Sequence, residues 1–171
     1  MNKHVPEANG KNFDSLKVAA PITTNEALNE IVKKYQKAEF LAVDTEFLRE
    51  RTYYPQLCLI QISDGVDAVA IDPLSKQLDL KPIWELMRNP AITKVFHAGG
   101  QDMEIFLHLM GDLPQPIYDT QIAAMVCGFG DQVSYENLVN TLLNIRIDKS
   151  SRVSNWSFRP LTEKQIKYAL S

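Results

Sequence analysis

Residues 40–62 read FLAVDTEFLRERTYYPQLCLIQI, and they predict a buried strand that ends in a pair of acids. Asp44 and Glu46 stand two positions apart, so their side chains point to the same side of an extended chain. Neighbouring carboxylates repel each other, and one tends to keep a proton unless a cation lies between them. Hard divalent ions such as Mg²⁺ and Mn²⁺ prefer oxygen ligands, so the pair fits a metal site. A solvated acidic loop explains the pair, taken alone, at least as well.

A third acid follows a glycine turn further along the chain. The sequence KVFHAGGQDMEIF, residues 94–106, predicts a strand, a turn and a helix whose first turn carries Asp102. Helix-dipole stabilisation is the simpler explanation for Asp102 alone. Because α/β proteins place their sites where strands end, Asp44, Glu46 and Asp102 can converge on one sheet edge as a cage for two metal ions. His97 ends an apolar strand, which favours a hydrogen-bonded structural histidine over a metal ligand.

The order of the expected elements predicts one α/β domain with a mixed sheet, because strands come first and then alternate with helices. We expect a flexible N-terminal segment over residues 1–20 and the folded domain over residues 21–171. Thr23 and Glu26 form a capping-box pattern at the first helix. Strands are expected at 39–45, 56–63, 67–73, 93–98 and 116–119, and helices at 23–38, 80–89, 100–110, 119–129, 134–145 and 161–171, the last capped by Thr162.

Composition and missing motifs exclude several classes of protein. The net charge is −3 and no run of Lys or Arg stands out, which argues against a protein that wraps duplex nucleic acid by charge. The sequence contains no GxGxxG fingerprint and no GxSxG elbow, so we reject a dinucleotide-binding fold and a serine hydrolase.

We expect Cys58 and Cys127 to be reduced and packed in the core. No apolar leader or membrane-length segment is present, so we expect a cytoplasmic protein without a membrane partner.

Several separated motifs occur together in one order, and they carry a family resemblance. These motifs are AVDTEF (42–47), LIQIS (59–63), FHAGGQDMEIF (96–106), YDTQIAA (118–124) and NWSFRPLTEKQIKYAL (155–170). With them, the chain resembles the ribonuclease D family of DEDD-type 3′–5′ exonucleases, in the subgroup that has a catalytic tyrosine. The resemblance implies a ribonuclease H-like α/β fold, with a five-stranded mixed sheet flanked by helices.

The resemblance also implies a site with two Mg²⁺ or Mn²⁺ ions held by four acids. Asp44, Glu46 and Asp102 match three of those acids, with Asp44 as the ligand shared by both ions. Tyr168 matches the tyrosine of the family's Tyr-x-x-x-Asp motif, where its hydroxyl orients the attacking water; an ordinary half-buried tyrosine is the alternative. The aspartate of that motif would follow Ser171, where the chain stops. We therefore expect a C-terminally truncated exonuclease domain that is weakly active or inactive compared with an extended version.

The implied partner is single-stranded RNA with a free 3′ end, tRNA precursors being the family's usual substrate, and no small-molecule cofactor is implied. Phe47 can stack on the terminal base or pack in the core. Lys149 and Arg152 can contact phosphates or belong to a solvated loop. Arg159 is expected to anchor the segment that leads to the last helix. Two alternatives stay open: a DNA 3′–5′ exonuclease of the proofreading type, and a non-catalytic nucleic-acid-binding scaffold.

Overall fold

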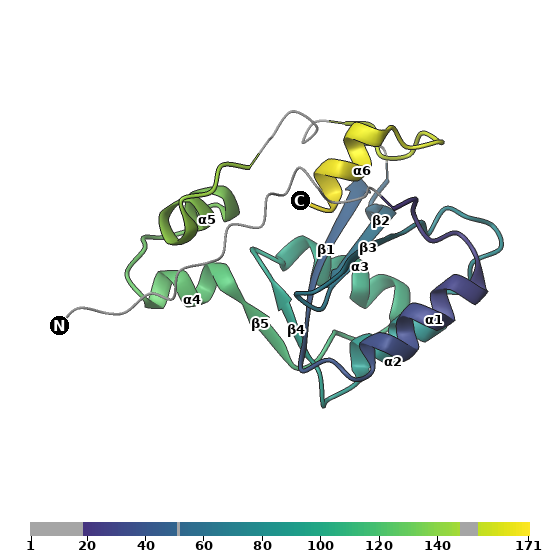
Figure 1. Ribbon diagram of the computed structural model, residues 1–171, viewed down its shortest axis with the longest axis horizontal. Coiled ribbons are helices and arrows are strands. Elements are labelled where there is room, and N and C mark those ends of the chain that lie inside the picture. The colour runs from purple at the N-terminus through teal and green to yellow at the C-terminus, as the bar shows by residue number, and fades with distance from the viewer. Residues whose placement is uncertain (1–18, 51, 148–153) are drawn as a thin grey trace.

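The computed structural model describes residues 19–50, 52–147 and 154–171, which form one mixed sheet with helices around it, residues 120–143 extending away from the sheet beyond its last strand (Figure 1). The strands are β1 (Phe40–Leu48), β2 (Gln56–Ser63), β3 (Ala68–Ile71), β4 (Thr93–Phe96) and β5 (Ile117–Asp119). The helices are α1 (Asn25–Tyr35), α2 (Lys81–Arg88), α3 (Gly100–Met110), α4 (Thr120–Val126), α5 (Tyr135–Leu143) and α6 (Glu163–Ala169). The expected elements are confirmed in type and order.

The sheet has five strands in the order β3-β2-β1-β4-β5, with β1 at its centre. The first three strands form an antiparallel meander, because short turns join them. Strands β4 and β5 each follow a helix and pair in parallel, β4 with β1 and β5 with β4. The mixed five-stranded sheet that the resemblance implied is therefore confirmed, and it puts the acid-bearing strand in the middle.

Two apolar clusters cover the two faces of the sheet. Alternation along β1 turns Leu41 and Val43 toward one face, where helices α1, α2 and α3 bury them. The other face carries a smaller cluster with Leu59 and Ala70, on which Trp156 and side chains of α6 pack. Figure 1 shows α6 beside one end of β1 and β2. Asp44 and Glu46 belong to this second face, because they alternate with Val43 and Thr45.

Local details differ from the sequence expectation at several places. Strand β1 continues through Asp44 and Glu46 to Leu48, because its pairing with β2 extends that far, whereas the expected strand ends at residue 45. Thr24, not Thr23, caps α1: its backbone is extended and its hydroxyl accepts a hydrogen bond from the amide of Ala27. Thr162 caps α6 as expected, in a capping box with Gln165. Cys58 is buried as expected, but Cys127 is exposed, since it follows the last residue of α4. Among the described residues, no helix is both long and apolar enough to cross a bilayer.

Candidate active site

Strand β1 carries Asp44 and Glu46 past the point where its pairing with β4 ends. The parallel pairing with β4 covers residues 40–42, whereas the antiparallel pairing with β2 continues to Leu48. The edge of β1 on the β4 side is therefore available beside both acids. A register shift between Glu46 and Phe47 adds a bulge at the same place, a distortion that is common next to active sites.

Helix α3 brings Asp102 to this edge of β1. The hydroxyl of Thr45 donates a hydrogen bond of 2.5 Å to Oδ1 of Asp102, and both residues are more than nine-tenths buried. Thr45 is the residue between Asp44 and Glu46. The structure thus places the third acid beside the strand segment that carries the other two, although 57 positions separate Thr45 from Asp102.

The turn before α3 fixes where the helix, and with it Asp102, begins. A Cβ atom on Gly99 would lie 2.8 Å from the Cβ of Phe96, closer than such atoms approach, so this position needs glycine. The Asp119 carboxylate accepts hydrogen bonds from the amides of Ala98 (3.1 Å) and Gly99 (3.0 Å). Burial by itself would raise the pKa of Asp119, but these amides and that of Gln121 hold it below its usual range. Asp119 therefore fastens the turn to the end of β5.

The three acids interact electrostatically. Burial, followed by the charges of Asp44 and Asp102, raises the pKa of Glu46 to about 8. Burial raises the pKa of Asp102 to about 6, a rise that the Thr45 hydroxyl reduces and the Asp44 charge increases. Asp44 keeps access to solvent, yet protein crowds its carboxylate and this burial raises its pKa, with the Thr45 amide and His97 acting in the opposite direction. Holding all three in the charged form is therefore costly without a cation.

These donors fit hard divalent ions, because they are all oxygen and their charges repel. Across residues 19–50, 52–147 and 154–171, no three His, Cys, Asp or Glu side chains are already arranged around a metal position. Asp102 has one carboxylate oxygen engaged by Thr45. The described residues therefore supply ligands of the right chemistry, and the carboxylates would have to close around an ion.

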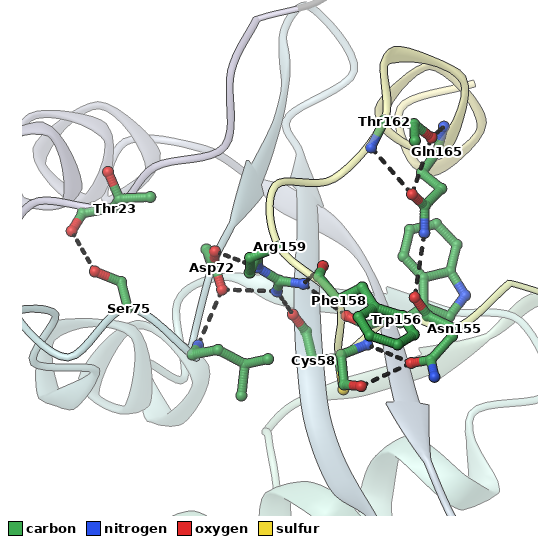
Figure 2. Close-up of polar contacts among 12 residues, drawn as sticks. Thr23, Cys58, Asp72, Ser75, Asn155, Trp156, Phe158, Arg159, Thr162 and Gln165 are labelled. Carbon is green, nitrogen blue, oxygen red and sulfur yellow. Dashed lines mark hydrogen bonds and ion pairs between the residues drawn. The ribbon is translucent and has the colours of Figure 1, made fainter.

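Tyr168 lies on α6, and the partly buried Arg159, just before this helix, fastens it to the sheet (Figure 2). The Arg159 guanidinium donates to both carboxylate oxygens of Asp72, at 2.6 and 2.8 Å, and to the Cys58 carbonyl at 2.7 Å. The ring of Tyr168 lies 6.1 Å from that of Trp156, centroid to centroid, within the smaller apolar cluster. Arg159 thus has the anchoring role expected of it, and its contacts hold α6 over the face that bears Asp44 and Glu46.

The remaining predicted residues fall into three groups. Phe47 packs against the main apolar cluster, which supports the core alternative for its side chain. Lys149 and Arg152 lie outside the described residues. His97 is a hydrogen-bonded structural histidine, as expected: Nδ1 lies 2.9 Å from the Thr120 hydroxyl and Nε2 lies 3.0 Å from the Val133 carbonyl oxygen.

Sequence reasoning missed three residues near the acids. Thr45 was overlooked because a threonine between two acids has no distinctive pattern, and Asp119 because it resembles an ordinary helix N-cap. Tyr135 opens α5 and its ring lies 5.6 Å from that of His97. Burial, and then the Asp44 charge, raises the pKa of Tyr135, so its hydroxyl is within electrostatic reach of the site. In the sequence, Tyr135 is a single aromatic residue at the start of a helix, and nothing in that pattern indicates a functional role.

Residues 19–171 match the family model described as a 3′–5′ exonuclease. Among curated proteins, the chain is similar to ribonuclease D of Gluconacetobacter diazotrophicus, with 52% identity over 148 residues, which cover 86% of this chain and 38% of that protein. The chain spans about two fifths of the length of the curated relatives it matches.

Two solved structures are similar to this one. The Escherichia coli RNase D structure, described as that of an exoribonuclease involved in structured RNA processing, has a TM-score of 0.83 and 44% identity, covering 87% of this chain and 40% of that one. Brucella melitensis NrnC with bound Mg²⁺ has a TM-score of 0.68 and 30% identity, covering 78% of this chain and 65% of that one. The similarity thus extends from sequence to fold, and one of these neighbours holds a divalent ion.

Proposed function

The chain belongs to the 3′–5′ exonuclease family, and from this premise we propose that it is the catalytic domain of a metal-dependent exoribonuclease. Its substrate is single-stranded RNA with a free 3′ end, tRNA precursors being the substrate that the ribonuclease D resemblance favours. The observation that carries the proposal is the hydrogen bond from Thr45 to Asp102, because it joins the strand of Asp44 and Glu46 to the helix that bears the third acid.

The acids bind two Mg²⁺ or Mn²⁺ ions in this proposal. The raised pKa values of Glu46 and Asp102 support it, because they mark carboxylates whose negative charge the protein alone does not offset. Bound divalent ions supply charge that activates a water molecule and stabilises the leaving oxygen in phosphodiester hydrolysis. The acidic site needs such ions before it can accept a phosphate, since the anionic backbone would otherwise be repelled.

The reaction releases one nucleoside 5′-monophosphate at a time. A water oxygen forms a bond to the phosphorus of the terminal nucleotide, and the bond from that phosphorus to the 3′ oxygen of the preceding nucleotide breaks. The proton lost by the water leaves to solvent, and the departing 3′ oxygen takes up a proton. The Tyr168 hydroxyl orients the attacking water, and the anchoring of α6 by Arg159 supports that role.

The proposal is tested with a 5′-labelled RNA of 20 to 30 nucleotides, a DNA of matched sequence and a circular form of the RNA, each incubated with Mg²⁺ or Mn²⁺. The protein is used as residues 1–171 and with one aspartate added after Ser171, the position where the family motif has an acid. We expect the RNA to shorten one nucleotide at a time from its 3′ end, faster with the added aspartate. We also expect the circle to stay intact and Asp44→Asn to abolish shortening.

Three results would contradict it. Cleavage of the circle would indicate an endonuclease. A clear preference for the DNA would indicate an enzyme of the proofreading type. Tight RNA binding without product, in both versions of the protein and with either ion, would indicate a nucleic-acid-binding scaffold.

A further inference from the structure

Gln61 is a buried amide without a hydrogen-bond partner. It lies on β2 with 6% of its surface exposed, and neither Nε2 nor Oε1 has a partner among the described residues. Burying unpaired amide groups costs free energy, so such groups are rare in folded proteins and call for an explanation. The Gln61 amide is therefore available for a hydrogen bond that this structure does not contain.

The strand register places Gln61 directly opposite Asp44. Residues opposite each other on antiparallel strands share a face, with Cβ atoms about 4.5 to 5.5 Å apart. On its other side Gln61 faces Ala70 of β3, whose methyl group offers no hydrogen bond. Asp72, two residues further along, already accepts hydrogen bonds from Arg159 on both carboxylate oxygens (Figure 2). Asp44 is therefore the carboxylate that directly faces the Gln61 amide across the strand pair.

We propose that Gln61 is a positioning residue whose Nε2 donates a hydrogen bond to the Asp44 carboxylate when that carboxylate binds a divalent ion. The inference rests on the proposed metal site. In the cation-free chain the amide stays unpaired, so no hydrogen bond offsets the free energy needed to bury it. When Asp44 turns toward an ion, its second oxygen meets the amide, so the cost is relieved and the carboxylate is held in one orientation. Gln61 thereby favours the metal-bound state at the expense of the cation-free state.

If Gln61 favours the metal-bound state in this way, removing its amide should weaken metal binding without lowering the stability of the cation-free chain. Gln61→Met keeps the side-chain length and removes both polar atoms. We expect roughly tenfold weaker Mn²⁺ binding, because a hydrogen bond to a charged group is lost. We expect the melting temperature of the cation-free chain to stay level or rise, because the unpaired amide is gone. Gln56→Met is the matched control: the same residue type on the same strand, but exposed, so both quantities should stay unchanged.

The experiment measures Mn²⁺ binding by isothermal titration calorimetry, and the melting temperature without divalent ions, for the unsubstituted chain, Gln61→Met, Gln61→Leu and Gln56→Met. Weaker binding with undiminished melting temperature in either Gln61 variant supports the inference. Mn²⁺ affinity within twofold of the unsubstituted chain in both Gln61 variants overturns it. Parallel loss of stability and affinity in both variants also overturns it, because the amide would then hold the sheet together. Failure to bind Mn²⁺ both in the unsubstituted chain and in the version with an aspartate added after Ser171 overturns the proposed metal site itself.

Discussion

The Thr45 hydroxyl donates a hydrogen bond of 2.5 Å to the Asp102 carboxylate, and this contact joins β1 to the first turn of α3. Both residues are buried, so water does not compete strongly for the bond. It orients the carboxylate that the proposed function assigns to metal binding. It also stabilises the charged form of Asp102, because the hydroxyl partly offsets the rise in pKa that burial causes.

Thr45→Val removes this hydroxyl while keeping the shape of the side chain. We expect the pKa of Asp102 to rise above its value of about 6, and Mn²⁺ affinity at pH 7 to fall. The loss of a hydrogen bond to a charged group predicts a fall of roughly tenfold. Thr45→Ser keeps the hydroxyl and should retain most of the affinity. Calorimetric titration of both variants checks this, and equal affinities for Val and Ser would show that the hydroxyl has no such role.

Gly99 and Gly100 form a matched pair for testing the turn before α3. Gly99→Ala puts a Cβ atom 2.8 Å from that of Phe96, whereas a Cβ atom on Gly100 meets nothing within 4 Å. We expect Gly99→Ala to lower the free energy of unfolding by about 1 to 3 kcal/mol through overpacking. Because α3 then shifts, Mn²⁺ affinity should fall as well.

Gly100→Ala, by contrast, should be neutral or stabilising by up to about 1 kcal/mol, since alanine restricts the unfolded chain. Urea denaturation and Mn²⁺ titration of both variants separate the two cases. Equal effects of the two alanines would contradict a specific need for glycine at position 99.

The Arg159–Asp72 pair should contribute far more to stability than the exposed pair Arg49–Glu104. Both arginines bind their carboxylate through two nitrogens, but the first pair is mostly buried and the second is exposed. Arg159→Met leaves Asp72 buried without its partner, which predicts a loss of about 3 to 5 kcal/mol in the free energy of unfolding.

Arg49→Met should cost less than about 1 kcal/mol, as is usual for exposed ion pairs. Chemical denaturation of the two variants measures both values. The fluorescence of Trp156 should also change in Arg159→Met, because the arginine binds the Trp156 carbonyl oxygen. Similar losses in the two variants would contradict an anchoring role.

The pH dependence of stability should reverse when a divalent ion binds. Without ions, the folded chain keeps a proton on Glu46 up to about pH 8, whereas the unfolded chain releases it near pH 4.5. The contribution of Glu46 to the free energy of unfolding is therefore greatest below pH 4.5, and it decreases as the pH rises toward 8. Asp102 acts in the same direction up to about pH 6.

Binding of Mn²⁺ needs the charged carboxylates, so its affinity should increase from pH 6 to 8 and protons should be released. Calorimetry in buffers with different ionisation enthalpies counts those protons. Mn²⁺ affinity that stays flat across this range, with no proton release, is the contradicting result. Glu46→Gln is the control, because it should remove most of the pH dependence.

The sequence predicts the elements well where the pattern is local. Apolar residues mark the strands β1 and β2, although β1 continues past the acids to Leu48, and Thr162 caps α6 as expected. The sequence does not distinguish Thr23 from Thr24 as the N-cap of α1, because threonine at either position is a good cap; in the structure Thr24 takes this place. Local patterns therefore predict an element better than its first residue.

Long-range contacts could not be predicted in the same way. Arg159 was expected to anchor its segment, but its partner Asp72 lies 87 positions away. Lys94 of β4 is fully buried, and its ammonium group donates hydrogen bonds to the carbonyl oxygens of Asn89, Ile92 and Gln115. Such partners depend on how segments meet in space. The acids of the candidate site were identified because strand ends converge in this class of fold.

Mn²⁺ titration of the unsubstituted chain beside Asp44→Asn, Glu46→Gln and Asp102→Asn tests the central claim most directly. The claim is that these acids act together to bind divalent ions at one edge of the sheet. We predict that each neutral substitution weakens Mn²⁺ binding at least about tenfold, because a negatively charged oxygen ligand is lost. Asp102→Asn should also raise the melting temperature of the cation-free chain at pH 7, because it removes a buried, repelled charge. Unchanged Mn²⁺ affinity in Asp102→Asn would contradict the claim, since the third acid would then have no part in the site.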